Sequence, residues 1–313
     1  MDSSLRLMFR RQIQVKYILT SQTITKLSIF LGLDAESGKL EAIKIFFPKK
    51  SKLQSLKLKK KVINQAKLQA KINHPNVVKV NHYFDSIPLY DSNGFPVSVS
   101  AIATEYIDLI GDLDDLIHLV QRMPEPLARS YFHKIIDALE EMHANNVAHA
   151  NLRPENILFD KSFNLKITGF GNAKVCSRDK PFKIKIREVD YYPPEVYNGM
   201  LRKRTDLDVF AAGIILFLMV FGHIPFSRAE IQNPVYRLLI YGEFERFWAV
   251  HDDILDMNDA EIGVSNELKE LLERMFDPNP NTRAGVEWIK QCDWYNGPTM
   301  GTEGLEKYLR IIG

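Results

Sequence analysis

The apolar residues of this chain change their spacing near residues 105–111, and this change limits the possible fold more than any other feature. Before it, segments rich in β-branched and apolar residues alternate with turn signals such as Glu36–Lys39 and Asp91–Gly94, which is typical of strands joined by hairpins. After it, apolar residues recur at the spacing of amphipathic helices. The sequence therefore predicts an α+β protein of two lobes, the first β-rich and the second mainly helical.

The first part contains five strand-like segments and one segment with helical spacing. The helical segment covers residues 51–72 and ends at Asn73, His74 and Pro75, which favour a turn. The strands are expected at 15–19, 26–33, 40–47, 77–84 and 97–106. These segments predict a small sheet accompanied by a single helix.

The second part is dominated by helical spacing. Pro126 begins an amphipathic helix that continues to Met142. The remaining segments are two short strands and four helices, expected at 156–159, 165–168, 206–221, 229–240, 265–276 and 284–291. The uncharged run between Asp208 and Arg228 is interrupted by glycine, histidine and proline, so it predicts a buried helix and no membrane span.

These segments divide the chain into four expected parts. They are an N-terminal extension at 1–14, a small lobe at 15–105, a large lobe at 106–296 and a C-terminal tail at 297–313. Of the 313 residues, 45% are apolar and 26% are charged, which is typical of a globular protein and excludes a disordered chain. The only two cysteines lack metal-ligand spacing, so we expect a reducing, cytoplasmic or cytoskeleton-associated setting.

Charge is distributed unevenly along the chain. Residues 1–84 contain 17 basic and 4 acidic residues, whereas residues 85–313 contain 24 basic and 35 acidic residues. The lysine-rich helix is by default a solvated helix face, but its charge also suits an anionic partner. We expect Lys59, Lys60 and Lys61 to meet a protein with an acidic surface, such as the tails of cytoskeletal filaments, with nucleic acid less favoured.

Several strings resemble the signature motifs of protein kinases, in the order and spacing of that family. Glu41-Ala-Ile-Lys44 is similar to the V-A-I-K strand, and His149–Asn156 is similar to the catalytic loop H-R-D-L-K-P-E-N. Gly169-Phe-Gly171 resembles D-F-G, and Pro193-Pro-Glu195 resembles A-P-E. The chain is identified as a degenerate member of this family over roughly residues 15–296, closest to calcium/calmodulin-dependent-type serine/threonine kinases.

The resemblance implies a bilobal protein-kinase-like fold and assigns two sets of residues. The nucleotide-binding candidates are Ile29, Ala42, Lys44, Glu105, Ile107, Asn156 and Leu158. The structural candidates are Arg153, Glu188, Glu195, Asp208 and Arg283. Within the second set, the resemblance implies that Arg283 pairs with Glu195, and matched charges suggest a pair between Arg153 and Glu188.

Three positions that carry kinase chemistry are occupied by other residue types. Gln65 stands where the glutamate that holds Lys44 is expected, and no acidic residue occurs between 42 and 84. Asn151 replaces the catalytic aspartate, and an amide cannot accept the proton of a substrate hydroxyl. Gly169 replaces the metal-binding aspartate of D-F-G. We therefore expect no catalytic residues at these degenerate positions.

The main functional hypothesis is a catalytically inactive kinase-like domain that acts as a protein-binding scaffold or allosteric partner. It requires no cofactor, holds ATP weakly if at all, and uses no magnesium or other metal. Two alternatives stay open at this point. One is an active serine/threonine protein kinase with unconventional catalytic residues, and the other is an anionic-surface binder that acts through the lysine-rich helix.

Overall fold

We describe a computed structural model of the chain. It describes residues 17–308, apart from residues 24–28, 35–36, 91–93, 177–190, 200–204, 257–262, 302–303 and 305–306. The chain divides into two compact units. The first unit comprises Met1–Asp108 with Phe170–Ala173, and the second comprises Leu109–Gly169 with Lys174–Gly313.

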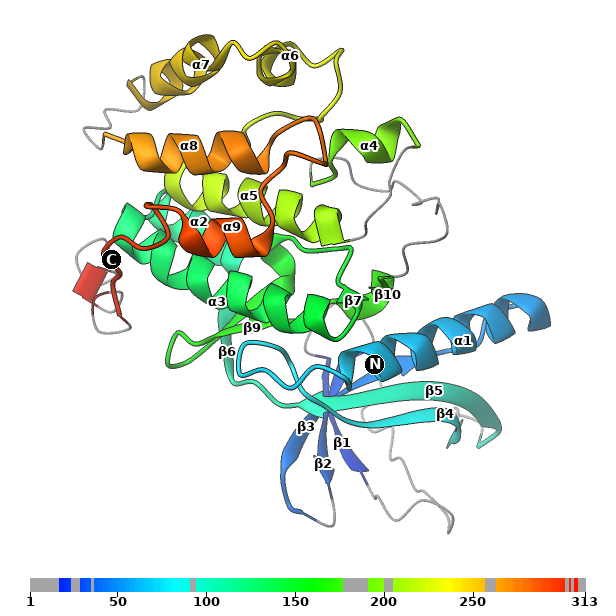
Figure 1. The fold of residues 1–313 in the computed structure, drawn as a ribbon. Coiled ribbons are helices and arrows are strands. Elements are labelled where there is room, and N and C mark those ends of the chain that lie inside the picture. Colours follow the sequence, from blue (N-terminus) through cyan, green and yellow to red (C-terminus); the bar gives the residue numbers. More distant parts are fainter. Residues whose placement is uncertain are drawn as a thin grey trace. The chain divides into compact units, whose positions relative to one another are not determined.

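The first unit is built on a five-stranded antiparallel sheet with the strand order β1-β2-β3-β5-β4. One long helix, α1, packs against this sheet (Figure 1). The elements are β1 (Tyr17–Thr23), β2 (Ile29–Asp34), β3 (Leu40–Phe46), α1 (Lys52–Gln69), β4 (Val80–Tyr90), β5 (Pro96–Glu105) and the short 3₁₀ helix η2 (Phe170–Asn172).

Alternation along β3 separates the two faces of the sheet. Ile43 and Ile45 are buried in one apolar cluster, while Phe46 belongs to the cluster that packs against α1. Helix α1 contributes Val62 and Ala66 to that second cluster. The buried residues of α1 lie in its C-terminal half, so its lysine-rich N-terminal half is mostly exposed.

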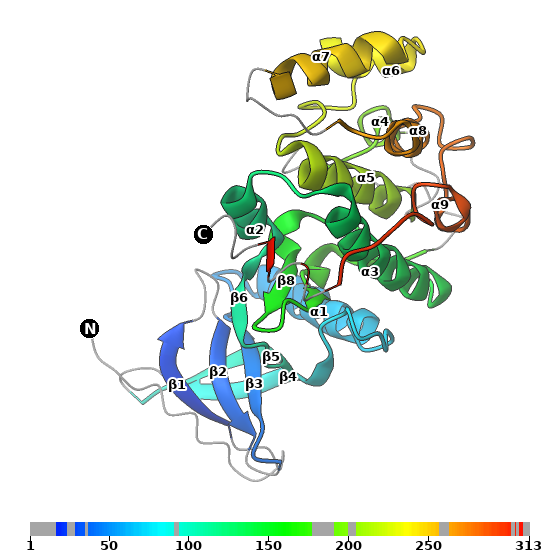
Figure 2. The ribbon, with the colours of Figure 1, turned by 90° about the vertical axis from the view of Figure 1, so that its left-hand side faces the viewer.

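The second unit is mainly helical. Helix α5 has no polar or charged side chain after Asp208 and lies between α3 and α8 (Figures 1 and 2), and 14 of its 17 residues are buried. The elements are β6 (Leu109–Asp112), α2 (Leu113–Val120), α3 (Glu125–Ala144), β7 (Val147–Ala148), η1 (Pro154–Asn156), β8 (Ile157–Asp160), β9 (Leu165–Ile167), β10 (Lys174–Val175), α4 (Pro194–Tyr197), α5 (Thr205–Phe221), α6 (Pro234–Ile240), α7 (Phe244–Asp256), α8 (Asn266–Met275) and α9 (Val286–Gln291).

The predicted α+β class, with a β-rich first part and a helical second part, is confirmed. Helix α6 begins later than the predicted helix over 229–240, because the side chain of Asn233 accepts hydrogen bonds from the backbone N–H groups of Val235 and Tyr236 and so caps the helix there. Helices α2 and α7 were not predicted. Among the described residues, no helix combines the length and apolar character needed to cross a membrane.

Candidate functional site

The backbone of the loop that resembles a catalytic loop is held by one buried carboxylate. Asp208, near the start of α5, is fully buried and accepts hydrogen bonds from the backbone N–H groups of His149 (2.9 Å) and Ala150 (2.7 Å). Nε2 of His143 lies 3.0 Å from the same carboxylate. These bonds fix Ala150 in the left-handed region, at φ 57°, which a residue with a Cβ adopts only at a cost.

His149 adds a second support to this loop. Its ring is fully buried, and Nε2 donates to the carbonyl oxygen of Thr168 at 2.7 Å. Burial lowers the pKa of His149, because a charged imidazolium would lose its hydration there. The ring is therefore a neutral structural donor between the loop and the segment that follows β9.

Glu195 and Arg283 form a buried, two-point ion pair within the second unit. Nη1 and Nη2 of Arg283 donate to the two carboxylate oxygens of Glu195 at 2.7 and 2.8 Å. Both side chains are almost completely buried, and Arg283 also donates to the carbonyl oxygen of Asp277. The structure thus brings together the two residues that the kinase resemblance matched, in the planar geometry that favours arginine–carboxylate pairs.

Asn151, Asn156 and Gly169 meet in one small cluster. Nδ2 of Asn156 donates to the carbonyl oxygen of Asn151 at 2.8 Å. A Cβ atom added to Gly169 would lie only 2.4 Å from Cγ of Asn156, and the φ angle of Gly169 is +89°. Any side chain at position 169 therefore requires Asn156 to move, besides the strain of a positive φ angle.

The chemistry of this cluster is that of neutral amides. Positions 151, 156 and 169 carry two asparagines and a glycine, so none of them offers a carboxylate to a metal ion or a base to a hydroxyl group. Leu158 is half-buried on β8, two residues after Asn156. The three positions do not fit a magnesium ion in the way that an aspartate-containing set does, since hard cations prefer carboxylate oxygens.

Arg153 pairs with Glu155, a partner that the sequence analysis did not consider. Its Nε atom lies 2.6 Å from Oε2 of Glu155, and Nη2 donates to the other carboxylate oxygen. Its guanidinium group also lies 5.6 Å from the centre of the Tyr191 ring. Glu188 lies outside the described residues, so the proposed pair between Arg153 and Glu188 stays a prediction.

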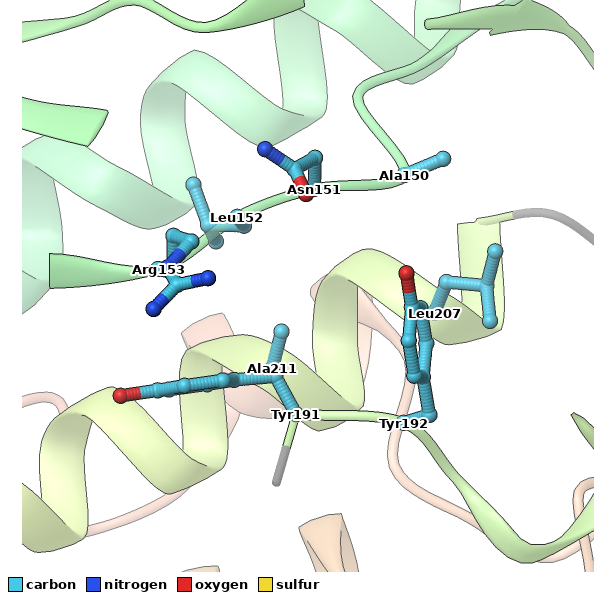
Figure 3. A pocket seen from close by; sticks show the side chains of 8 residues that line it. All are labelled: Ala150, Asn151, Leu152, Arg153, Tyr191, Tyr192, Leu207 and Ala211. Atoms are coloured by element: carbon cyan, nitrogen blue, oxygen red, sulfur yellow. The ribbon is translucent and has the colours of Figure 1, made fainter. Parts of the chain in front are cut away.

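A narrow pocket of about 20 Å³ lies beside Asn151 and Arg153. This volume has room for roughly one water molecule. Figure 3 shows Tyr191 and Tyr192 facing the loop, with the Tyr192 side chain pointing toward the segment that contains Ala150.

Three nucleotide-binding candidates are neighbours on one face of the first unit's sheet. Ile29 pairs with Lys44, and Ala42 lies two residues before Lys44 on β3. Burial lowers the pKa of Lys44, and the nearby charge of Lys61 lowers it further. Lys61 on α1 is thus a positive charge near Lys44. In an active kinase, the helix at this place supplies a glutamate to the lysine, and here that position is Gln65.

Gln65 is buried on α1, and its Oε1 atom lies 3.7 Å from the position that a Cβ atom at Gly171 would take. Glu105 ends β5, and its Oε1 atom accepts a hydrogen bond from the backbone N–H of Lys79 at 2.9 Å. Ile107 is half-buried two residues later. The structure therefore places Glu105 and Ile107 in the segment that ends the first unit.

The lysines chosen as interaction residues differ in their surroundings. Lys60 and Lys61 are exposed on α1. Lys59 is only half-exposed, and its Nζ atom lies 3.3 Å from Oδ2 of Asp85 on β4. Asp85 therefore already neutralises part of the charge that the sequence analysis assigned to a partner.

The comparisons with known proteins match the chain to one family. The chain matches the protein kinase domain family over residues 27–295. It is 29% identical over 267 residues to CBL-interacting serine/threonine-protein kinase 24 of Arabidopsis thaliana, covering 84% of this chain and 53% of that protein. It is 30% identical over 225 residues to SNF1-like protein kinase ssp2 of Schizosaccharomyces pombe, covering 72% of this chain and 34% of the relative.

CBL-interacting protein kinase 32 of Oryza sativa subsp. japonica is 29% identical over 279 residues, which is 88% of this chain and 57% of the relative. The chain thus spans about half the length, or less, of these relatives. They are of the calcium/calmodulin-dependent and SNF1 type, in line with the resemblance in the motifs. Catalytic inactivity stays a prediction.

The relatives correct one expectation and favour one alternative. They are named as protein kinases, a class that uses ATP together with Mg²⁺, so the expectation that no magnesium is involved is contradicted. They also support the alternative of an active serine/threonine kinase better than the hypothesis of a catalytically inactive domain. On the match over residues 27–295, the chain belongs to the protein kinase family.

Proposed function

We propose that this protein kinase domain acts mainly by binding other proteins and that its phosphotransfer activity is strongly impaired. The observation that carries the proposal is the cluster of Asn151, Asn156 and Gly169. The amide of Asn156 lies against the Cα atom of Gly169, in the space that a side chain at position 169 would enter. This contact leaves little room for the aspartate that kinase chemistry uses there.

Phosphoryl transfer depends on positioned charge more than on covalent chemistry. Asn151 cannot take a proton from a substrate hydroxyl, and Gly169 contributes no negative charge. Residues that act as a catalytic unit show strongly non-additive losses, so the loss of one already removes most of the rate.

The second candidate function is serine/threonine phosphotransfer, and the relatives favour it. Lys44 and Asn156 are kept at positions that kinases use, and the Asp208 and Glu195–Arg283 contacts hold the surrounding backbone. In this case ATP and magnesium would supply the phosphoryl group and its charge neutralisation, as in the family.

A phosphotransfer assay separates the two candidates. The purified full chain is incubated with radiolabelled ATP, magnesium and a mixture of serine- and threonine-containing peptides, beside the variants Lys44→Met and Asn156→Ala. If the domain works by binding, all three proteins give the same background signal. Transfer by the wild type that disappears in both variants would establish the kinase activity and refute the proposal.

For the binding function we propose a protein partner with an acidic surface, for example the acidic tail of a cytoskeletal filament. The support is the run of eleven lysines without an acidic residue between 42 and 84, together with the exposure of Lys60 and Lys61. A labelled polyglutamate peptide tests it. The triple variant Lys59→Glu, Lys60→Glu, Lys61→Glu should bind this peptide more weakly, and the difference should shrink as salt is added. Unchanged binding at low salt contradicts the proposal.

A further inference from the structure

Asp34, Glu41 and His82 bring three potential metal ligands together on the sheet of the first unit. One carboxylate oxygen of each acid and one ring nitrogen of His82 all lie within 4.8 Å of one another. Both acids are almost completely buried, whereas His82 is exposed. Donor atoms bound to one zinc ion at about 2.0–2.2 Å lie at most about 4.4 Å apart, so small side-chain rotations are enough to close the set around an ion.

The strand pairings explain why these three residues meet. Asp34 ends β2, and Glu41 is the second residue of β3, just after the turn that joins the two strands. The backbone N–H of Asp34 donates to the carbonyl oxygen of Lys39 at 2.9 Å and so closes this turn. His82 lies on β4 and pairs with Ala103 of β5, the strand between β4 and β3. The small side chain of Ala103 leaves space for the ring of His82 to reach toward β3.

Hydrogen bonds from neighbouring side chains orient both acids. Oγ of Ser37 donates to Oδ2 of Asp34 at 2.5 Å, and Nδ2 of Asn81 donates to Oε1 of Glu41 at 2.8 Å. Donors of this kind are typical partners of ligating carboxylates, whose orientation they fix. Asn81 directly precedes His82, where the pairing of β4 with β5 shifts its register. This irregularity lets two successive residues of β4 serve the same place, one as a donor to Glu41 and one as a ligand.

The charge at this place favours a cation. The carboxylates of Asp34 and Glu41 are buried and close together, so they repel each other, and a divalent cation between them removes this repulsion. Glu105 pairs with Glu41 across β3 and β5, so a third carboxylate is carried on the same face of the sheet. A cation there interacts favourably with all three acids.

This face of the sheet is separate from the nucleotide-binding candidates. Successive residues of a strand point to opposite faces, and along β3 the buried positions are Glu41, Ile43 and Ile45. Ala42 and Lys44 therefore lie on the other face. An ion held by Glu41 is thus distinct from the magnesium ion of phosphoryl transfer, and its binding does not depend on whether the domain transfers phosphate.

We propose that Asp34, Glu41 and His82 form a zinc site that fastens the β2–β3 hairpin to β4. Two carboxylates and one imidazole supply three ligands, and a water molecule completes a tetrahedral set. The imidazole nitrogen selects zinc over Mg²⁺ and Ca²⁺, which prefer oxygen ligands. The exposed ring of His82 gives the ion a path from solvent. No short sequence motif announces the site, because its ligands come from three different strands.

The test measures zinc binding to the full chain, freed of any affinity tag that contains histidine. Isothermal titration calorimetry should show one Zn²⁺ ion bound per chain, and an excess of Mg²⁺ or Ca²⁺ should not displace it. Co²⁺ in place of zinc should give the visible absorption of a tetrahedral complex, which reports the ligands directly.

Matched variants locate the ion. His82→Gln should weaken zinc binding about tenfold or more and abolish the tetrahedral Co²⁺ spectrum, since it removes the nitrogen ligand. The control is His118→Gln, which should change the affinity less than about twofold. His118 is also exposed and also lies beside a carboxylate, that of Asp114 at 3.7 Å. Asn81→Ala should weaken binding roughly tenfold without removing a ligand, because it releases the carboxylate of Glu41.

The exposed position of His82 keeps the test decisive even if variants of the buried acids fail to fold, and equal unfolding midpoints of His82→Gln and the wild type without metal verify its fold. Equal zinc affinities of His82→Gln and the wild type overturn the proposal, as does the absence of zinc binding at submillimolar concentration. Equal losses in His82→Gln and His118→Gln assign the binding to scattered surface histidines and contradict it. Tighter binding of Ca²⁺ or Mg²⁺ than of Zn²⁺ also contradicts it.

Discussion

The loop over residues 149–156 makes two kinds of polar contact in the second unit. At its start, the buried carboxylate of Asp208 accepts hydrogen bonds from two backbone N–H groups, and the ring of His149 donates to a backbone carbonyl. At its end, Asn156 donates to the carbonyl of Asn151 and fills the space beside Gly169. The first group combines the charged carboxylate of Asp208 with the neutral ring of His149, and the second uses neutral amides only.

The residues that hold the backbone of the loop are therefore different from the residues at the positions where kinases carry out their chemistry. The supporting contacts, including the distant Glu195–Arg283 pair, are complete and buried. Of the positions that meet substrate and metal in kinases, 151 and 169 carry an asparagine and a glycine in place of aspartates, while Asn156 is kept. If the supporting contacts and the amide cluster are independent, substitutions in the supporting contacts should lower the free energy of unfolding strongly. Substitutions in the amide cluster should lower it less.

The largest effect is expected from breaking the buried ion pair. Arg283→Ala leaves the carboxylate of Glu195 buried without its partner, so the free energy of unfolding should fall by roughly 3–5 kcal/mol. Urea unfolding measures this loss. The double variant Glu195→Gln, Arg283→Met should lose less than Arg283→Ala alone, because no charge is left unpaired. An Arg283→Ala protein as stable as the wild type would show that the pair does not anchor the fold.

A smaller loss is expected at the loop itself. Asp208→Asn keeps the shape of the side chain but replaces one carboxylate oxygen by an NH₂ group. An NH₂ group cannot accept a hydrogen bond from a backbone N–H, so the bond to either His149 or Ala150 is lost. Removing a charge-assisted bond should cost about 2–3 kcal/mol. Chemical denaturation gives the value, and Asp253→Asn, at an exposed position on α7, is the control. Equal effects of the two variants would contradict the role of Asp208.

Substitutions in the cluster of Asn151, Asn156 and Gly169 should lower the free energy of unfolding by less, and the effects at positions 156 and 169 should depend on each other. Gly169→Ala introduces a Cβ atom at positive φ and displaces the Asn156 amide, at a cost of roughly 1–3 kcal/mol. In an Asn156→Ala background the same change should cost clearly less, because the steric conflict is gone. A double-mutant cycle of unfolding free energies measures this coupling. Additive effects would mean that Asn156 does not occupy the space beside Gly169.

The smallest effect is expected at Lys44, and its size depends on pH. Burial and Lys61 lower the pKa of Lys44 in the folded state, so the unfolded chain holds this proton more tightly and the charge opposes folding at neutral pH. Stability should therefore rise as pH increases from the lowered pKa toward the ordinary lysine value of about 10.4.

Lys44→Met should be slightly more stable than the wild type near neutral pH, and the difference should shrink in alkaline solution. Unfolding curves at both pH values test this, with the exposed Lys60→Met as the control. A Lys44→Met protein that is less stable than the wild type at neutral pH would show that Lys44 gains a favourable charge contact instead.

Much of the fold follows from local pattern. The switch in apolar spacing near residue 105 predicts the order of strands and helices, because burial imposes a period of about two on strands and 3.6 on helices. Helix α2 is missing from that prediction, although its capping box of Asp112 and Asp115 is a readable start signal. Helix α6 shows the opposite error, since its cap at Asn233 marks the true beginning.

The site is predictable only where motifs name both partners. The Glu195–Arg283 contact joins residues that are 88 positions apart in the sequence, yet the motifs identify its two ends. The contact of Asn156 with Gly169 depends on backbone angles that no motif encodes. Gln69 illustrates the same limit: it is a buried polar residue on α1, and its amide donates to the carbonyl oxygen of Val78 at 2.8 Å.

The contacts of Asp208 have a consequence for mutational tolerance. They are directed at the main-chain N–H groups of residues 149 and 150, which every residue except proline provides, so these bonds do not depend on the side chain at position 151. A substitution at 151 leaves them in place. A loop held through its backbone keeps its conformation when the side chain at position 151 changes. Such a loop can therefore lose or change its chemical activity before it loses its fold.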